Sequence, residues 1–269
     1  MQMVTYHREG YVGFITLNRP ERRNALNPVV WKALDAAIGE AEADEEARVI
    51  LVRGKGKSFC AGLDLSPENE MFSSVKEAAS ATQKTKFFRE VRKTQDIHTR
   101  LERLTRPTVA AIHGHCLGAG LELALCCDIR ICSEETVFAF PEAKLGFITD
   151  VGGLQRIVKI VGPAHAREIA FRGHRFDAKR AQAVNLVNDV YPDKETLDAK
   201  TMEMVEEIAS NPPLAVQGAK EVFLFDEEAP LHQSLEYNAA RSSMIIPSED
   251  FSEAISAYME KRKGDFKGA

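Results

Sequence analysis

Short apolar runs and helical patterns alternate along residues 1–195 of the chain. Residues 4–8 and 12–17 alternate apolar and polar side chains around a Glu-Gly turn, which predicts a β-hairpin. The runs 49–52 and 108–112 are apolar throughout, as in strands that are buried on both faces. Each run leads into a glycine-containing loop. The repeated order of strand, glycine loop and helix predicts a layered α/β domain with successive turns of similar build.

Helical spacing of apolar residues fills most of the remaining sequence. Before Asp193 it occurs in four segments: 28–44, 84–104, 152–161 and 177–183. Residues 184–190 return as a short predicted strand, and from Asp193 onward the pattern is almost wholly helical. We therefore expect an α/β core with the active site in residues 1–195. We expect residues 196–269 to form a helical C-terminal region that closes the site or joins subunits.

The composition is that of an ordinary soluble protein. The chain has 269 residues, 44% of them hydrophobic, a formal net charge of -5 and a pI near 5.9. This acidic balance argues against nucleic acid or an anionic membrane as the main partner, because both are bound with lysine and arginine. The sequence shows no signal-like start and no apolar stretch long enough to span a bilayer. We expect a cytoplasmic protein.

The cysteines and histidines carry no recognisable metal or disulfide pattern. The five cysteines lie in apolar segments without the spacing of a secreted disulfide framework, so we expect buried thiols. His113 and His115 are not accompanied by C-x-x-C or H-E-x-x-H, so packing beside a turn is a better interpretation than zinc binding. Residues 54–58, GKGKS, lack the first glycine of a Walker loop and are interpreted as a basic turn. No metal site is predicted.

Candidate chemistry is concentrated in residues 113–156. Small residues around Ala119 open a helix, so an anionic oxygen can approach the unpaired amides of its first turn. Three acids follow in this segment: Glu122, Glu142 and Asp150. Amide donors that stabilise an enolate, together with acids that remove or return a proton, indicate proton transfer next to a carbonyl. A second free amide is indicated at Leu63, between a glycine and an aspartate.

Several motifs, taken together in order, resemble the crotonase superfamily, the enoyl-CoA hydratase and isomerase fold. They cover nearly the whole chain: LNRPERRNALN, FCAGLDL, AAIHGHCLGAGLELALCCDIRIC, FPEAKLGFITDVGGLQR, NPPLA and EAISAYMEKRKGDF. The resemblance implies a spiral of ββα turns with a helical C-terminal region, and a homotrimer or a hexamer built as a dimer of trimers. It also implies an acyl-CoA thioester as substrate. Coenzyme A is then part of the substrate, and no separate cofactor is implied.

The resemblance also implies roles for individual residues. The backbone N–H groups of Leu63 and Ala119 would form an oxyanion hole for the thioester oxygen. In hydratases, the glutamates that match Glu122 and Glu142 hold and activate the water that adds across the double bond. Coenzyme A would contact the following residues, the last of them from this or a neighbouring subunit: Arg22, Asn24, Ala25, Leu26, Cys60, Ala61 and Lys261.

Asp150 separates two interpretations of the reaction. Typical hydratases of this kind have glycine at the matching position, whereas the Δ3,5-Δ2,4-dienoyl-CoA isomerases have an aspartate that handles the proton at the far end of the diene. Glu122 matches the hydratases instead, because those isomerases carry aspartate at the position of Glu122. We expect a dienoyl-CoA isomerase of fatty-acid β-oxidation, with an enoyl-CoA hydratase as the alternative. An aspartate before Val-Gly-Gly also suits a helix N-cap, which is the structural alternative for Asp150.

Two further alternatives are open at this point. Residues 66–83 are polar, and either a lid over the site or a plain surface loop fits them. Some members of the superfamily bind RNA or act as scaffolds without catalysis. The acidic balance, the lack of a basic-aromatic patch in the sequence and the presence of all three acids weigh against that role.

Overall fold

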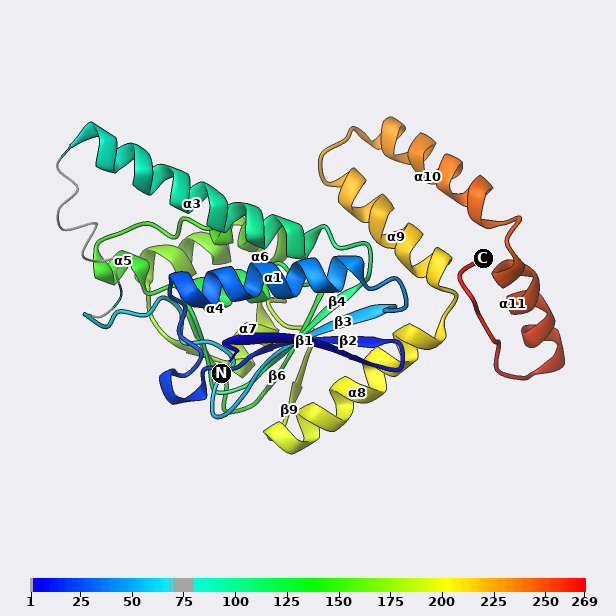
Figure 1. Ribbon diagram of the computed structural model, residues 1–269, viewed down its shortest axis with the longest axis horizontal. Coiled ribbons are helices and arrows are strands. Elements are labelled where there is room, and N and C mark those ends of the chain that lie inside the picture. Colours follow the sequence, from blue (N-terminus) through cyan, green and yellow to red (C-terminus); the bar gives the residue numbers. More distant parts are fainter. Residues whose placement is uncertain (1, 68, 70–79) are drawn as a thin grey trace.

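The computed structural model describes residues 2–67, 69 and 80–269, and it shows a layered α/β arrangement with a helical extension (Figure 1). In this part of the chain, six strands form the larger of two sheets, in the order β1 (Val4–Glu9), β2 (Val12–Leu17), β3 (Val49–Gly54), β4 (Thr108–Ile112), β6 (Ile129–Ser133) and β9 (Asp189–Tyr191). The smaller sheet has three: β5 (His115–Leu117), β7 (Val137–Ala139) and β8 (Phe176–Asp177). The predicted α/β class is confirmed.

The chain winds between these two sheets. β1 and β2 form the predicted antiparallel hairpin, and every later neighbour in the larger sheet is parallel. β4 of the larger sheet is followed by β5 of the smaller one, and β6 is followed by β7. Because β4 pairs with β6 and β5 pairs with β7, one turn of the chain stacks on the next. This repeat is the predicted spiral of ββα turns.

Helices cover both faces of the larger sheet, since its inner strands are apolar on both sides. Ile50 of β3 lies in one buried cluster with Leu34 of α1 (Pro28–Ala43). Its neighbour Leu51 points the other way and lies in a second cluster with Val205 of α8 (Lys194–Ser210). The other described helices up to β9 are η1 (Pro20–Arg22), α3 (Ala81–Glu102), α4 (Ala119–Ala124), α5 (Glu142–Leu145), α6 (Gly153–Arg172) and α7 (Ala178–Ala183).

The strand expected at residues 184–190 is largely wrong. Only β9, at its end, pairs with β6. Leu186 and Val187 are buried, but they follow α7 in a turn and pair with no strand of the described chain. The apolar run therefore reflects packing beneath the turn and not strand pairing, which a short run cannot distinguish.

The boundary expected between residues 195 and 196 falls within α8. This helix packs against the larger sheet, and the helices that leave the sheet are α9 (Pro213–Asp226), α10 (Leu231–Ile245) and α11 (Glu249–Glu260) (Figure 1). The helical extension therefore begins after Ser210. It carries exposed apolar side chains, among them Phe223 at 71% and Tyr258 at 83% exposure.

The cysteines, the membrane-spanning potential and residues 66–83 were also the subject of predictions. All five cysteines are buried free thiols, as predicted. Among the described residues, no helix is both long and apolar enough to cross a membrane. The lid or loop expected at residues 66–83 falls largely outside the described residues, which omit 68 and 70–79.

Candidate active site

Two backbone amides indicated by the sequence are left without acceptors. Leu26 N donates to Gly62 O at 2.8 Å and Asp64 N donates to Leu26 O at 2.8 Å, so the pairing passes over the amide of Leu63. Ala119 is the first residue of α4, where an amide has no partner inside the helix. Among the described residues, neither Leu63 N nor Ala119 N donates a hydrogen bond.

Gly62 brings these two amides together. Its φ is +88°, and a Cβ at this position would lie 2.6 Å from Leu117 O and 3.7 Å from Ala119 N. Only a residue without a side chain fits such an approach. Leu63, the next residue, therefore lies beside the N-terminus of α4. Two unpaired amides at one place have the arrangement that stabilises an oxyanion.

Glu142 lies at the start of α5 and is 5% exposed. Its carboxylate lies against Gly118, where a Cβ would collide with Oε1, and Thr149 Oγ1 donates to Oε2 at 3.2 Å. Burial raises the pKa of Glu142, and the charge of Asp150 raises it further. A carboxyl with a raised pKa beside the oxyanion amides is suited to proton exchange with a bound carbonyl compound.

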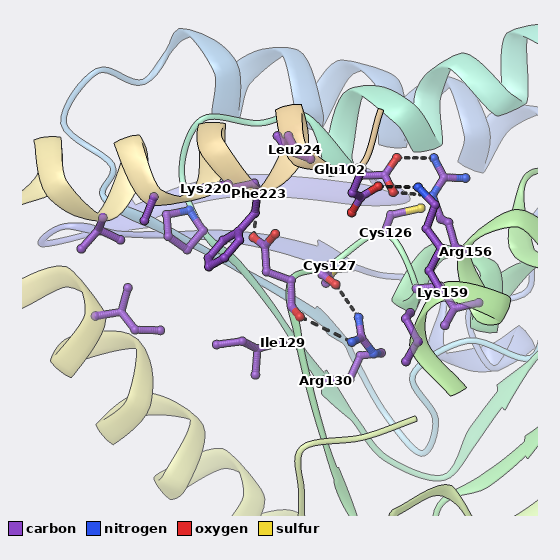
Figure 2. Close-up of a pocket in the computed structure, with 18 residues that line it drawn as sticks. Glu102, Cys126, Cys127, Ile129, Arg130, Arg156, Lys159, Lys220, Phe223 and Leu224 are labelled. Atoms are coloured by element: carbon purple, nitrogen blue, oxygen red, sulfur yellow. Dashed lines mark hydrogen bonds and ion pairs between the residues drawn. The ribbon is translucent and has the colours of Figure 1, made fainter. Parts of the chain in front are cut away.

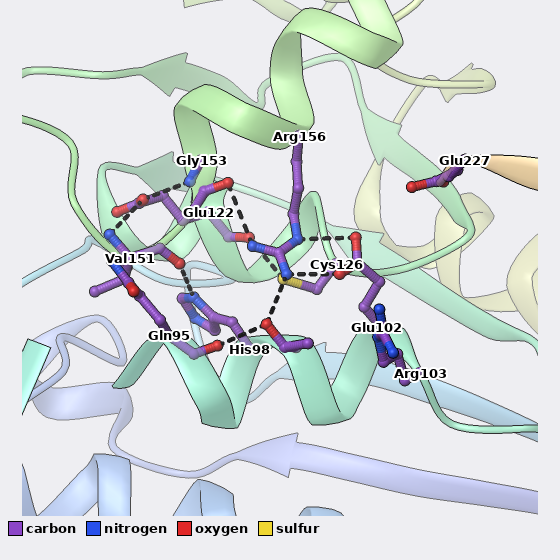
Figure 3. Close-up of polar contacts among 12 residues, drawn as sticks. Gln95, His98, Glu102, Arg103, Glu122, Cys126, Val151, Gly153, Arg156 and Glu227 are labelled. Atoms are coloured by element: carbon purple, nitrogen blue, oxygen red, sulfur yellow. Dashed lines mark hydrogen bonds and ion pairs between the residues drawn. The ribbon is translucent and has the colours of Figure 1, made fainter. Parts of the chain in front are cut away.

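Glu122 projects from α4 and is 2% exposed. Its Oε1 accepts the amides of Val151 at 3.1 Å and Gly153 at 2.8 Å, at the start of α6 (Figure 3). Burial raises the pKa of Glu122 to about 8, against the lowering effect of these two bonds, and the charges of Glu142 and Asp150 add to the rise. Burial dominates because the ionised form loses nearly all contact with water.

Asp150 is not the N-cap of α6. The helix begins at Gly153 after the cap residue Gly152, and no side-chain hydrogen bond is made from that cap position. Glu122 instead receives the helix's first amide. Burial raises the pKa of Asp150, and its charge acts on both Glu122 and Glu142. The structure therefore brings the three predicted acids into one site.

Replacing Glu122 with glutamine is expected to stabilise the fold at alkaline pH. The unfolded carboxyl ionises near pH 4.5 and the folded one near pH 8, so the folded state keeps a proton that the unfolded state has lost. Wild-type stability should therefore fall by up to ~1.4 kcal/mol per pH unit across this window because of this group. Glutamine does not ionise, and its Oε1 can still accept the amides of Val151 and Gly153.

Urea unfolding across this pH window measures the effect. Between about pH 5 and pH 9, the free energy of unfolding of the glutamine variant should rise relative to that of the wild type by about 2–5 kcal/mol. Glu134→Gln, at an exposed position, is the control and should show no such gain. A stability difference that stays constant with pH would contradict the raised pKa of Glu122.

The segments expected to hold coenzyme A run side by side. Ala61 N donates to Arg23 O at 2.9 Å, and Cys60 Sγ donates to Asn24 O at 3.1 Å. The Arg22 side chain is exposed next to them. Four of the predicted residues are buried and can offer a ligand little beyond backbone groups: Asn24, Ala25, Leu26 and Cys60.

The side chain of Asn24 is engaged within the fold, and Lys261 lies at the end of α11, away from this site. Asn24 Nδ2 donates to three backbone carbonyls, so its amide holds the surrounding loop. Lys261 follows α11 in the helical extension, on the opposite side of the molecule from α4 and α5 (Figure 1). A contact from Lys261 to such a site therefore requires a neighbouring subunit, which was one of the two predicted alternatives.

An ion pair that was not predicted from the sequence lies next to the Leu63 amide. Arg19 Nη1 donates to Asp64 Oδ2 at 2.6 Å and to Ala25 O at 3.0 Å. Burial acts to raise the pKa of Asp64, but the hydrogen bonds from Arg19 and Ser66 and the charge of Arg19 together outweigh it, so the pKa is lowered. The sequence contained a signal for this ion pair, because Arg19 and Asp64 lie in the motifs LNRPERRNALN and FCAGLDL.

Each of the two histidines of the candidate segment makes a polar contact within the fold. His113 Nε2 lies 2.9 Å from Gly56 O, and His115 Nδ1 lies 3.1 Å from Ser58 Oγ. Across residues 2–67, 69 and 80–269, no group of three or more His, Cys, Asp or Glu side chains is arranged to hold a metal ion.

A separate cavity of about 590 Å³ lies between α9 and the end of the larger sheet (Figure 2). Cys126, Arg130 and Lys220 line it, and none of the three acids is among its described lining residues. Lys220 Nζ donates to Asp128 Oδ2 at 2.8 Å, and Arg130 Nε donates to Leu186 O at 2.9 Å. These charged groups are bonded within the fold. Because none of the three acids lines the cavity, it is separate from the candidate active site.

Comparison with known protein families decides the family of this chain. The sequence model of the family described as enoyl-CoA hydratase/isomerase matches residues 7–269. The chain belongs to the enoyl-CoA hydratase/isomerase family. Membership confirms the resemblance that the motifs indicated, the crotonase-type fold and an enzymatic role.

Relatives in the enoyl-CoA hydratase/isomerase family include both reaction types. The chain is 34% identical to the mitochondrial Delta(3,5)-Delta(2,4)-dienoyl-CoA isomerase of Dictyostelium discoideum, over 96% of this chain and 88% of the relative. It is also 34% identical to the 2,3-dehydroadipyl-CoA hydratase of Escherichia coli K12, over 100% of both. A crystal structure of an enoyl-CoA hydratase from Bacillus anthracis has a TM-score of 0.89 and 31% identity, covering 100% of both chains. Overall similarity therefore does not separate the two reactions.

Proposed function

We propose that this protein is a Δ3,5-Δ2,4-dienoyl-CoA isomerase whose thioester substrate lies between the two oxyanion amides and the three acids. The observation that carries the proposal is the placement of Asp150, a half-buried carboxyl that caps no helix and acts electrostatically on Glu122 and Glu142. Hydration needs only two acids, whereas a diene shift needs a proton delivered far from where one is removed. The similarity to dienoyl-CoA isomerases supports the same reaction.

The proposed reaction moves one proton equivalent along the acyl chain. Glu142 removes a proton from C2, and the amides of Leu63 and Ala119 stabilise the dienolate charge on the thioester oxygen. Asp150, in its protonated form, delivers a proton to C6, so the 3,5 double bonds become 2,4 double bonds. Glu142 ends protonated and Asp150 ionised, and proton exchange with solvent restores both. The raised pKa of Asp150 supports its part as the acid.

Glu122 tunes this reaction without transferring the proton. With a pKa of about 8, it is mostly neutral at neutral pH. A neutral Glu122 adds no repulsion to an ionised Glu142, so the base can keep its charge inside a buried site. Its Oε1 also fixes the backbone that follows Asp150.

An enoyl-CoA hydratase is the second candidate, and Glu122 is the observation that favours it. Both backbone bonds of Glu122 go to Oε1, and no described residue donates to Oε2, which is available to hold a water together with Glu142. The hydratase of Escherichia coli K12 supports this alternative at the same identity as the isomerase relative.

A side-by-side assay of the wild type on 3,5-dienoyl-CoA and 2-enoyl-CoA tests the proposal. Formation of the conjugated 2,4-diene is followed by its ultraviolet absorbance, and loss of the 2-enoyl group is followed in the same way. Isomerisation as fast as hydration or faster supports the isomerase. Hydration far faster than isomerisation would favour the hydratase.

We also propose that copies of the chain form a homotrimer or a dimer of trimers. The exposed apolar side chains of the helical extension, such as Phe223 and Tyr258, support an interface there, because exposed apolar patches are disfavoured in water. Lys261 ends α11, which lies far from α4 and α5 (Figure 1), and this supports a site completed by a neighbouring subunit. Analytical ultracentrifugation distinguishes these assemblies from a monomer. A cytoplasmic location, a role in β-oxidation and the lack of a cofactor beyond substrate coenzyme A stay predictions.

A further inference from the structure

The turn that carries Asp150 is held by side chains and not by its own backbone. Among the described residues, neither Asp150 nor Val151 takes part in a backbone–backbone hydrogen bond. Gln95 Nε2 of α3 donates to Asp150 O at 2.5 Å, and His98 Nδ1 lies 2.8 Å from Val151 O (Figure 3). The position of Asp150 therefore depends on Gln95 of α3, which lies 55 residues earlier in the chain.

The same turn is held from its other side by Glu122. Its Oε1 accepts the amides of Val151 and Gly153, while α3 takes the carbonyls of Asp150 and Val151 (Figure 3). The carbonyl and amide of Val151 thus bond in opposite directions, to α3 and to α4. A turn clamped in this way keeps the neighbouring carboxyl of Asp150 at a fixed place relative to Glu122.

His98 is suited to this task by its protonation state. A carbonyl oxygen only accepts, so Nδ1 must carry the hydrogen that it shares with Val151 O. The ring is 0% exposed and packs edge-on against Trp31, with centroids 5.2 Å apart. Nε2 is buried without a partner among the described residues, which costs free energy. Among the described residues, the bond to Val151 O is therefore the only hydrogen bond that this ring makes.

Gln95 is oriented by a neighbour on the same helix. Arg92 Nη1 donates to Gln95 Oε1 at 2.7 Å, so the amide nitrogen of Gln95 is turned toward Asp150 O. Both side chains that reach the turn therefore present a donor in a defined direction. This polar pair sits one helical turn apart, at positions 95 and 98, on a single face of α3.

We propose that Gln95 and His98 are positioning residues that place the Asp150 carboxyl for proton delivery to C6. The inference rests on the proposed isomerase function, in which Glu142 acts at C2 and Asp150 at C6. Glu142 is anchored outside this turn, because its backbone starts α5 and its carboxylate lies against Gly118. Loss of either α3 donor therefore impairs the second proton transfer and leaves the first one in place.

The test compares variants with and without a donor on α3. His98→Leu and Gln95→Met remove the donor at similar volume, whereas His98→Asn keeps an N–H close to the place of Nδ1. Each is assayed for kcat and KM with 3,5-dienoyl-CoA, and for exchange of the C2 hydrogen with D2O by NMR. Lys93→Met, on the exposed side of α3, is the matched control.

Donor removal should lower kcat by about 10- to 10²-fold, since a small misplacement of a reacting group has effects of this size. KM and C2 exchange should stay near wild type, and His98→Asn should recover most of kcat. Parallel loss of C2 exchange and kcat would overturn the inference, as would wild-type kcat in the donorless variants. If His98→Leu fails to fold, Gln95→Met alone tests the inference, because Gln95 is only half-buried.

The two proposals fail in different ways. A wild-type enzyme that exchanges C2 hydrogen but forms no 2,4-dienoyl-CoA refutes the isomerase function, and the present inference with it. A wild-type enzyme that isomerises, with variants that are equally active, refutes only the role of Gln95 and His98.

Discussion

Replacing Asp150 with asparagine is expected to lower kcat for conversion of 3,5-dienoyl-CoA to the 2,4-isomer by about 10²- to 10⁴-fold. Asparagine has nearly the same shape, but it has no carboxyl proton to deliver to C6. The backbone should stay in place, because Gln95 bonds the main-chain carbonyl of residue 150 and not its side chain. Affinity for the CoA ester should therefore change little.

Two readouts and a control variant separate this chemical loss from a folding defect. Binding of a non-reactive saturated acyl-CoA should match that of the wild type, and exchange of the C2 hydrogen with D2O should persist because Glu142 is intact. Asp189→Asn, at an exposed position in β9, is the matched control and should keep full activity. Undiminished turnover in Asp150→Asn would remove Asp150 from the mechanism and favour the hydratase.

The parts of the fold that follow from local patterns were predictable from the sequence. Buried strands such as β3 and β4 are apolar on both faces, and this is visible as an unbroken run. The free amide at Ala119 follows from a helix that opens with small residues. The acids were found because they share a segment, and the resemblance of several motifs in order gave them roles.

Contacts between distant segments were not predictable. The carboxylate of Glu122 bonds to Gly153, 31 residues away, and takes the helix-capping part that a local pattern assigned to Asp150. Gln95 and His98 look like ordinary polar residues of an amphipathic helix until the fold brings the turn of Asp150 against them. The packing of helix α8 against the larger sheet was not predictable either, because an apolar stripe on a helix can pack on a sheet or on a neighbouring subunit equally well.

Replacing Gly62 with alanine is expected to lower kcat by about 10²- to 10³-fold, the size of losing one oxyanion donor. A Cβ at Gly62 would lie 2.6 Å from Leu117 O, so the segment must move away from α4 and carry the Leu63 amide with it. The two amides would then no longer converge on one oxygen. Loss should appear in both C2 exchange and diene formation, because each passes through the dienolate.

A glycine elsewhere isolates this steric effect from backbone strain. Gly10 also has a positive φ, +56°, but a Cβ there would meet nothing within 4 Å. Gly10→Ala should therefore cost about 1 kcal/mol of stability and no activity, since left-handed backbone is strained for alanine wherever it occurs. If Gly62→Ala behaves like Gly10→Ala, the Leu63 amide does not bind the thioester oxygen. If only Gly62→Ala loses C2 exchange, close approach of two segments, and not glycine flexibility, creates the oxyanion hole.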